Sequence, residues 1–254
     1  MNYKIIFLVL CILLLFYLFN NFLITDKEHF DNQEKIPKII IQTWKSKDIP
    51  DKYKEDIDSV KKYNNDFKIL FFDDNDIETF LKKNYPQYYE SYMKLPVKIQ
   101  KIDYFRYIAI YHYGGFYLDL DMTCLYPLDE LLNYDCIFPV DTNLNNNNCR
   151  KIRFNNMCNN NMKIVLGQYA FAAKPKNEFI KLLIDTIHNN VDKYIEDNEK
   201  KGNKRIYVYT STGPDFVTNL YMNYANKSSV HILEYKDGQY FGKYAKHNHY
   251  GTWK

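Results

Sequence analysis

Tryptophan, glycine and cysteine are scarce in this chain, and neither sign of charge dominates it. Its 254 residues include 2 Trp, 8 Gly and 5 Cys, and the formal net charge is +3. Lysine and arginine are scattered among acidic residues, so no basic stripe indicates a nucleic-acid partner. No Gly-x-x-x-x-Gly-Lys-Ser/Thr loop is present to hold phosphate, and no nucleophile elbow or protease-like spacing occurs. These absences argue against P-loop enzymes, triad hydrolases and nucleic-acid-binding proteins.

The few cysteines leave the redox state of the chain open. Their spacings match no zinc pattern, which argues against a structural zinc domain. Cys11 lies in an apolar run, and an even number remain, at positions 124, 136, 149 and 158. Two disulfides are possible if these residues face an oxidising compartment, and four free thiols are the alternative.

A long hydrophobic run marks the N-terminus. Residues 5–24 are almost wholly apolar, and about 20 such residues suffice for a membrane-spanning helix. Lys4 precedes the run, which favours a cytoplasmic N-terminus. A cleaved signal peptide is the alternative, although no small-x-small site follows. We therefore predict a transmembrane signal anchor at 1–24, a short stem at 25–35 and a domain at 36–254, in a single-pass type II protein with a lumenal (Golgi- or ER-type) domain.

Beyond the stem, hydrophobic periodicity predicts alternating strands and helices. The predicted strands are 36–44, 67–72, 116–121, 137–140, 164–173 and 205–209. The predicted helices are 50–63, 77–84, 97–113, 177–194 and 215–224. Residues 133–161 around the fourth strand are predicted to be a long asparagine-rich loop. This alternation indicates an α/β fold with a Rossmann-like, mostly parallel sheet flanked by helices.

The most informative segment is a double glycine followed by an apolar strand with two carboxylates, residues 114–121. Alternation along a strand would place Tyr117, Asp119 and Asp121 on one face. Two carboxylates at the end of an apolar strand are costly to bury without a cation, and a divalent metal holding a diphosphate is the natural candidate. Two further Asp-x-Asp triplets, at 56–58 and 74–76, lie in polar surroundings and are interpreted as a solvated helix face and a turn.

The helix at 97–113 carries a charged pair toward this strand. Asp103 and Arg106 are three residues apart at the edge of its apolar stripe. A plain intrahelical ion pair is the simplest interpretation. Because the helix leads directly into the turn before Asp119, we expect both side chains to lie in the site, at the carboxyl ends of the strands.

Five segments together resemble the glycosyltransferases that contain the DXD sugar-binding region, a family with yeast mannosyltransferases. The segments, in order, are 36–44, 72–74, 103–121, 212–214 and 249–253. The block at 103–121 is highly specific, and the others would be weak alone. The resemblance implies the GT-A fold, a nucleotide-sugar donor, Mn²⁺ or Mg²⁺ as the metal and retention of anomeric configuration. It also fits an N-terminal membrane anchor.

The resemblance also implies roles for particular residues. Catalytic roles would fall to Asp103, Arg106 and Asp119; donor contacts to Trp44, Asp103, Arg106, Asp119, Gln168, Thr252 and Trp253; and metal contacts to Asp119, Asp121 and His249, with His247 as the alternative histidine. Three positions depart from the family pattern. Ile41 stands where the family carries His, Gln168 where it often has Asn, and Thr252 where it usually has Ser.

The predicted function is therefore a metal-dependent, retaining hexosyltransferase. GDP-mannose is the favoured donor, with UDP-galactose or UDP-glucose next, and the acceptor would be a glycan or a lipid-linked glycan. Two alternatives remain. One is an inactive nucleotide-sugar-binding scaffold, and the other is a membrane-anchored structural protein whose Asp119 and Asp121 bind calcium.

Overall fold

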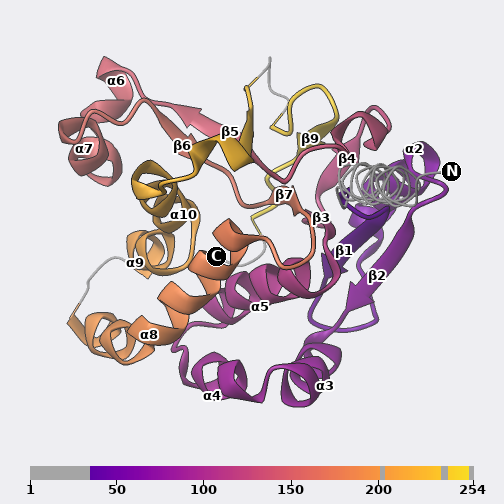
Figure 1. The fold of residues 1–254 in the computed structure, drawn as a ribbon, viewed down its shortest axis with the longest axis horizontal. Coiled ribbons are helices and arrows are strands. Elements are labelled where there is room, and N and C mark those ends of the chain that lie inside the picture. Colours follow the sequence, from indigo (N-terminus) through magenta and orange to yellow (C-terminus); the bar gives the residue numbers. More distant parts are fainter. Residues whose placement is uncertain (1–34, 201–203, 236–239, 252–254) are drawn as a thin grey trace, which may run out of the picture. The chain divides into compact units, whose positions relative to one another are not determined.

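The computed structural model describes residues 35–200, 204–235 and 240–251 (Figure 1). The predicted anchor at 1–24 and all but the last residue of the stem lie outside these residues. Within them, no helix is both long and apolar enough to span a membrane. The anchor therefore stays a prediction.

A mixed sheet runs through the middle of the described part, with strand order β2-β1-β3-β7-β5-β6 and with β8 paired to β5. The bounds are β1 Ile39–Thr43, β2 Lys68–Phe72, β3 Gly115–Leu118, β5 Cys136–Asn143, β6 Ile164–Leu166, β7 Ala170–Ala173 and β8 Val230–Leu233. Pairing is parallel between β1 and both β2 and β3, and between β5 and β8. It is antiparallel where β7 joins β3 and β5, and where β6 joins β5. Strands β1, β2, β3, β5 and β8 thus point one way and β6 and β7 the other, which confirms a mostly parallel sheet.

A second, two-stranded sheet lies beside the carboxyl end of β3. It pairs β4, Met122–Cys124, antiparallel with β9, Ala245–His247, and sets Met122 opposite His247. Neither strand was predicted, because three residues are too few for periodicity to show. This pairing brings a late segment of the chain to the turn after β3.

Helices cover both faces of the central sheet (Figure 1). One face packs on α3 Asp74–Asn84, α4 Pro86–Lys94, α5 Lys98–Tyr113, α8 Glu178–Lys200, α9 Lys204–Ser211 and α10 Pro214–Asn223. The other packs on α2 Lys54–Tyr63, β4 and β9. Short 3₁₀ turns occupy Asp51–Tyr53, Asp129–Leu131 and Lys227–Ser229. The α/β class with flanking helices is confirmed.

Two glycines make the tight connection from α5 into β3. Gly114 has φ +66° and Gly115 has φ +91°, a region that side chains with a Cβ rarely adopt. A Cβ on Gly115 would also lie 2.4 Å from the carbonyl oxygen of Ile39 in β1. Glycine is therefore required for β3 to pair with β1 directly after the helix.

Several sequence predictions of local structure are wrong. The predicted strand 205–209 is part of α9, whose buried residues Tyr207, Val208 and Ser211 follow a helical spacing. Its aromatic and β-branched residues favoured a strand by propensity alone. The predicted loop 133–161 contains α6 Asn146–Cys149 and α7 Ile152–Asn159, and α4 was not predicted.

The predicted strand 164–173 is interrupted. Residues 167–169 separate β6 from β7, although both line the same β5 strand. The interruption matters for function because it places Gln168 and Tyr169 at the carboxyl edge of β3.

The cysteines follow neither of the two predicted patterns. Cys149 and Cys158 form one disulfide that closes α6 onto α7, with Cα atoms 5.7 Å apart. Cys124 and Cys136 are free and buried. Burial raises the pKa of the Cys124 thiol to about 12, so this thiol is protonated and inert at neutral pH.

Candidate functional site

The two carboxylates of the Asp-x-Asp motif lie in a turn rather than along a strand. Strand β3 ends at Leu118, and the Met122 amide donates a hydrogen bond to the Asp119 carbonyl oxygen at 3.1 Å. The predicted strand to 121 was therefore too long. Tyr117 and Asp119 lie on one face, as strand alternation predicted, since the Tyr117 hydroxyl donates to the Asp119 carboxylate at 2.8 Å. Asp121 reaches the same region because the turn folds it back.

Strand β9 completes this cluster by supplying His247. One ligand atom from each of Asp119, Asp121 and His247 lies within 4.8 Å of the others. His247 Nε2 is 3.3 Å from an Asp121 carboxylate oxygen, and the Tyr250 amide donates to the other oxygen at 2.9 Å. The structure thus brings His247, rather than His249, to the two carboxylates. The His249 ring lies beside that of His247 in a tilted orientation, with ring centroids 4.0 Å apart.

Asp56, from the Asp-x-Asp triplet at 56–58, holds the two short strands β4 and β9 in place. Asp56, interpreted from sequence as part of a solvated helix face, is instead buried. Its carboxylate accepts hydrogen bonds from the Thr123 hydroxyl at 2.5 Å and from the Asn248 amide at 2.9 Å. It therefore fastens β4 to the residue after β9. Asp58 is exposed, as predicted.

Arg106 lies between two carboxylates at the other side of the site. Its guanidinium is 3.2 Å from the carboxylate of Asp103 and 3.7 Å from that of Asp119, and it donates to the Gln168 carbonyl oxygen at 3.0 Å. Asp103 is 0% exposed and Arg106 4%. The Thr212 hydroxyl donates to Asp103 at 2.7 Å. The pair predicted on the helix is thus a buried link between α5 and the Asp119 carboxylate.

Burial and charge act against each other on these carboxylates. Burial raises the pKa of Asp103 although Arg106 and Thr212 oppose it. Burial also raises the pKa of Asp119, against the effect of Arg106. Burial alone would raise the pKa of Asp121, but hydrogen bonds with His247 and Tyr250 hold it below its usual value. A further cation near Asp119 would favour its ionised form.

Tyrosine hydroxyls hold the side chains in place. Tyr117 contacts Thr43 at the end of β1, with hydroxyls 3.1 Å apart, and its ring lies 4.6 Å under the Arg106 guanidinium. The Tyr107 hydroxyl bonds the Gln168 side chain and the Thr212 carbonyl oxygen. No role for Tyr107 or Thr43 was predicted from the sequence. Each bonds residues far away in the chain, and such contacts form only when the chain is folded.

The remaining predicted residues fall at or beyond the edge of the described site. Trp44 packs edge-on against Tyr53 at 5.0 Å, and Tyr53 contacts Tyr250 at 5.4 Å, so the end of β1 meets the segment after β9. The indole nitrogen of Trp44 is buried and has no hydrogen-bond partner among the described residues. Thr252 and Trp253 lie outside the described residues.

The cluster of Asp119, Asp121 and His247 fits a single divalent cation. Neighbouring ligand atoms of one six-coordinate ion lie about 3–4 Å apart. The three ligand atoms here lie within 4.8 Å of one another, so small side-chain movements would bring them to that spacing. Two carboxylates and an imidazole suit Mn²⁺, while Mg²⁺ prefers oxygen ligands. His247 Nδ1 is buried and unbonded within the described part of the chain, so the ring retains capacity for a ligand. The residues present therefore fit the predicted metal.

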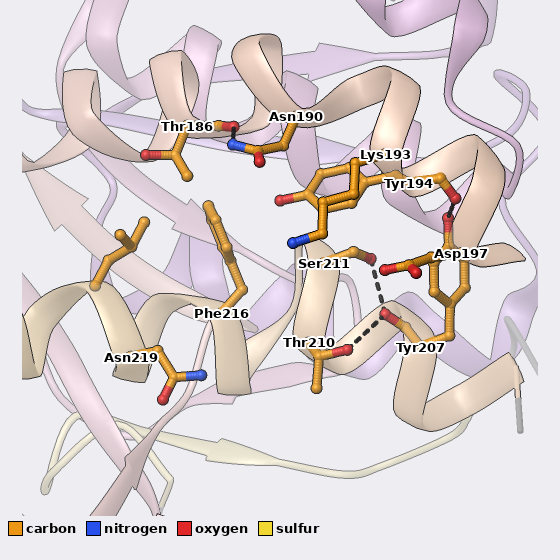
Figure 2. A pocket seen from close by; sticks show the side chains of 11 residues that line it. Thr186, Asn190, Lys193, Tyr194, Asp197, Tyr207, Thr210, Ser211, Phe216 and Asn219 are labelled. Atoms are coloured by element: carbon orange, nitrogen blue, oxygen red, sulfur yellow. Dashed lines mark hydrogen bonds between the residues drawn. The ribbon is translucent and has the colours of Figure 1, made fainter. Parts of the chain in front are cut away.

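A separate pocket lies away from this chemistry, among α8, α9 and α10 (Figure 2). Its polar groups mostly bond within the helices that carry them. The Asn190 side chain donates to the Thr186 carbonyl oxygen, and the Ser211 hydroxyl to that of Tyr207. None of its lining residues belongs to the carboxylate cluster, and we do not interpret this pocket as the active site.

Comparison with known proteins places this geometry in a family. Residues 50–138 match the family described as glycosyltransferase sugar-binding region containing DXD motif. The chain is 31% identical over 194 residues to inositol phosphoceramide mannosyltransferase 1 of Schizosaccharomyces pombe, covering 75% of this chain and 53% of that protein. It is 31% identical over 111 residues to the initiation-specific alpha-1,6-mannosyltransferase of Candida albicans, covering 41% and 29%. The chain thus spans about half the length of the first relative and less of the second.

A solved structure shares the fold. The PaToxG glycosyltransferase superposes with a TM-score of 0.51 and 17% identity, covering 77% of this chain and 73% of that one.

Asp103, Arg106, Asp119 and Asp121 all fall inside the matched range 50–138. Residues 50–138 therefore match the DXD-containing sugar-binding region of glycosyltransferases, which confirms the resemblance predicted from the sequence, and mannosyltransferases are among the proteins that this chain resembles.

Proposed function

We propose that this protein is a metal-dependent, retaining mannosyltransferase with a GT-A catalytic domain. One observation carries the proposal: the DXD carboxylates meet His247 within 4.8 Å while Arg106 lies 3.7 Å from Asp119. A cation site and a fixed guanidinium at one sheet edge suit a diphosphate leaving group, whose developing charge needs positive partners.

The relatives favour GDP-mannose as the donor and an inositol phosphate lipid head group or a mannoside as the acceptor. Both are mannosyltransferases, and one is an inositol phosphoceramide mannosyltransferase. UDP-glucose and UDP-galactose are the next donors. The site itself does not distinguish the bases, so the donor choice rests on the family.

The residues would divide the work as follows. Asp119, Asp121 and His247 would hold the divalent ion, which when bound neutralises the diphosphate. Arg106 stays charged in its buried position and orients both Asp119 and the sugar. Asp103 fixes Arg106 through their ion pair and is itself fixed by Thr212. Two routes would retain the anomeric configuration. The acceptor hydroxyl would attack from the face that the diphosphate leaves and give its proton to the departing diphosphate, or the sugar would first be transferred to a nucleophile of the enzyme and then to the acceptor.

The proposal includes a lumenal location behind an N-terminal anchor. The apolar run at 5–24 supports the anchor. The disulfide between Cys149 and Cys158 supports an oxidising compartment, because disulfides rarely persist in reducing cytosol. Reaction of the chain in sealed microsomes with a membrane-impermeant protease would test this orientation.

Thermal denaturation of the full chain in detergent tests the function. Samples would contain Mn²⁺ and one of GDP, UDP, GDP-mannose, UDP-glucose or UDP-galactose, and EDTA would replace Mn²⁺ in a parallel series. A ligand at about 100 times its Kd stabilises by about 2.7 kcal/mol, which raises the Tm of a domain this size by roughly 5–10 °C. We expect that shift for GDP and GDP-mannose, with Mn²⁺ only.

Two variants sharpen the test. Asp121→Ala should abolish the shift, whereas Asp58→Ala, which changes an exposed residue of another Asp-x-Asp triplet, should not. Donor hydrolysis then separates an active enzyme from an inactive binding scaffold. Stabilisation by metal with no nucleotide effect, in a folded sample, would indicate the structural metal-binding protein and refute the proposal.

A further inference from the structure

A third carboxylate, Asp141, reaches the same sheet edge as the DXD motif. It lies near the carboxyl end of β5, and Asp119 directly follows β3. Both strands run in the same direction with β7 between them. Because neighbouring strands lie about 4.8 Å apart, the axes of β3 and β5 are separated by about 10 Å. Asp119 and Asp141 are therefore carried to the same edge of the sheet by two strands that have only β7 between them.

The strand carries an irregularity at this residue. Val140 pairs with Leu166 and Thr142 with Val165, so the register with β6 shifts by one across Asp141. Asp141 is the extra residue of this bulge. Bulges redirect a side chain and occur often beside active sites. Residues 167–169, which interrupt the facing strand, lie at the same level, since the Gly167 amide donates to the Pro139 carbonyl oxygen at 2.8 Å.

The carboxylate of Asp141 has a local hydrogen-bond partner but no matched cation among the described residues. The Thr142 hydroxyl donates to it at 3.0 Å. It interacts electrostatically with Arg153, His247 and His249, but the described residues form no ion pair with it. Arg153 is committed elsewhere, because its guanidinium bonds the buried Asp215 carboxylate at 2.7 Å. Asp141 therefore retains hydrogen-bonding capacity toward the site.

Two aromatic residues, Tyr169 and Tyr240, form a ring wall near the Asp141 carboxylate. Tyr169 stacks on His247 with centroids 4.4 Å apart, and Tyr240 lies edge-on to His249 at 4.4 Å. The Tyr169 hydroxyl donates to the Tyr240 carbonyl oxygen at 2.9 Å, which fixes the two segments together. Burial raises the pKa of both tyrosine hydroxyls, and the charge of the nearby Asp141 adds to this effect. Tyr169 is buried and supports this part of the site, whereas Tyr240 is partly exposed and can contact a ligand. Aromatic rings with a few placed polar groups are the usual lining of a site for a small organic ring.

The chemistry favours a neutral ligand here. A carboxylate without a paired cation repels a diphosphate, so this side of the site does not suit the phosphates of the donor. It suits hydroxyl groups, which donate to a carboxylate and form strong charge-assisted hydrogen bonds. We propose that Asp141 binds the acceptor: its carboxylate accepts a hydrogen bond from a hydroxyl of a polyol ring, which packs against Tyr240. This inference rests on the proposed function and deepens it.

The test compares transfer with hydrolysis in the full chain in detergent. With Mn²⁺ and GDP-mannose, mannose is counted as released to water or transferred to myo-inositol, methyl α-mannoside or inositol phosphoceramide. Asp141→Asn keeps the shape and removes the charge. It should lower the ratio of transfer to hydrolysis by roughly tenfold to a hundredfold, the range for one hydrogen bond to a charged group. The loss should appear mainly as a higher acceptor KM.

A matched control and a second variant show whether the effect is specific to the proposed acceptor site. Asp135→Asn changes an exposed residue just before β5, whose partner is Lys174 at 2.6 Å, and should leave the ratio unchanged. Tyr240→Leu removes part of the ring wall from another segment and should lower the ratio in the same direction. Tm values of all variants exclude loss of fold as the cause.

Three results would overturn the inference. If Asp141→Asn lowers hydrolysis as much as transfer, the residue serves the donor or the fold. If the wild-type protein hydrolyses GDP-mannose but transfers to none of the polyols, the acceptor class is wrong. If it neither binds nor hydrolyses any nucleotide sugar, the proposed function fails and this inference fails with it.

Discussion

Replacing Arg106 with methionine should strongly destabilise the protein, and the reason is Asp103. Asp103 is 0% exposed and its counter-ion is the guanidinium 3.2 Å away. Arg106→Met keeps a long side chain but leaves a buried carboxylate without a cation. Breaking one side of a buried pair costs about 3–5 kcal/mol, a large part of a total stability of about 5–15 kcal/mol.

The stability lost in Arg106→Met should be larger at neutral pH than at acidic pH. Burial already raises the pKa of Asp103 to about 6 in the native protein, against the effect of Arg106. At pH values between the ordinary pKa of an aspartate and this raised pKa, the native state binds more protons than the unfolded state. Stability from this group is therefore complete at acidic pH and is lost as pH rises through the native pKa. Without Arg106 the native pKa rises further, so the deficit should be small near pH 4 and grow toward pH 8.

Urea denaturation of the full chain in detergent, across this pH range, measures the effect. Adding Asp103→Asn to Arg106→Met should recover much of the lost stability and flatten its pH dependence, since the introduced amide carries no charge and its oxygen still accepts from Thr212. Lys82→Met, which breaks an exposed pair with Glu78, should change stability by less than about 1 kcal/mol. A cost below about 1 kcal/mol for Arg106→Met, or no recovery in the double variant, would refute the reasoning.

Further predictions concern the support of the site and of the fold. Tyr117→Phe removes the hydroxyl that orients Asp119 and should weaken Mn²⁺ affinity at least about tenfold with little change in Tm, as measured by isothermal titration. Gly115→Ala should cost more than about 2 kcal/mol in urea denaturation, because the Cβ would lie 2.4 Å from a β1 carbonyl oxygen. Gly242→Ala, also at a positive φ but with its nearest neighbours 3.6 Å away, should cost only about 1 kcal/mol, and equal costs would refute the clash. Replacing Cys149 and Cys158 with serine opens a loop with a sequence separation of 9 and should cost about 2–3 kcal/mol, and a negligible loss of Tm would contradict this.

Sequence reasoning succeeded where the information is local. The helix at 97–113, the double glycine and the two carboxylates follow one another without a gap, so periodicity and turn chemistry located the charged pair and the DXD motif together. The structure confirmed that Asp103, Arg106 and Asp119 lie within one network. The mostly parallel sheet also followed from the alternation of strands and helices.

It failed where position depends on pairing between distant segments. His247 reaches the candidate metal site through the short β4 and β9 strands, which are too short to show a hydrophobic period in the sequence. Asp56 looked solvated in a charged stretch, yet tertiary contacts bury it behind β4. Asp141 drew no attention because a bulge depends on the register with β6, which the sequence does not reveal.

The β4–β9 pairing has a consequence for the order in which the protein matures. Asp119 and Asp121 are synthesised early, but His247 arrives only after every strand of the central sheet has been made. A nascent chain would carry two carboxylates without their third partner, and would bind metal weakly. Tight metal binding would then mark chains whose β9 has docked, so that metal occupancy would distinguish finished molecules from incomplete ones during biosynthesis.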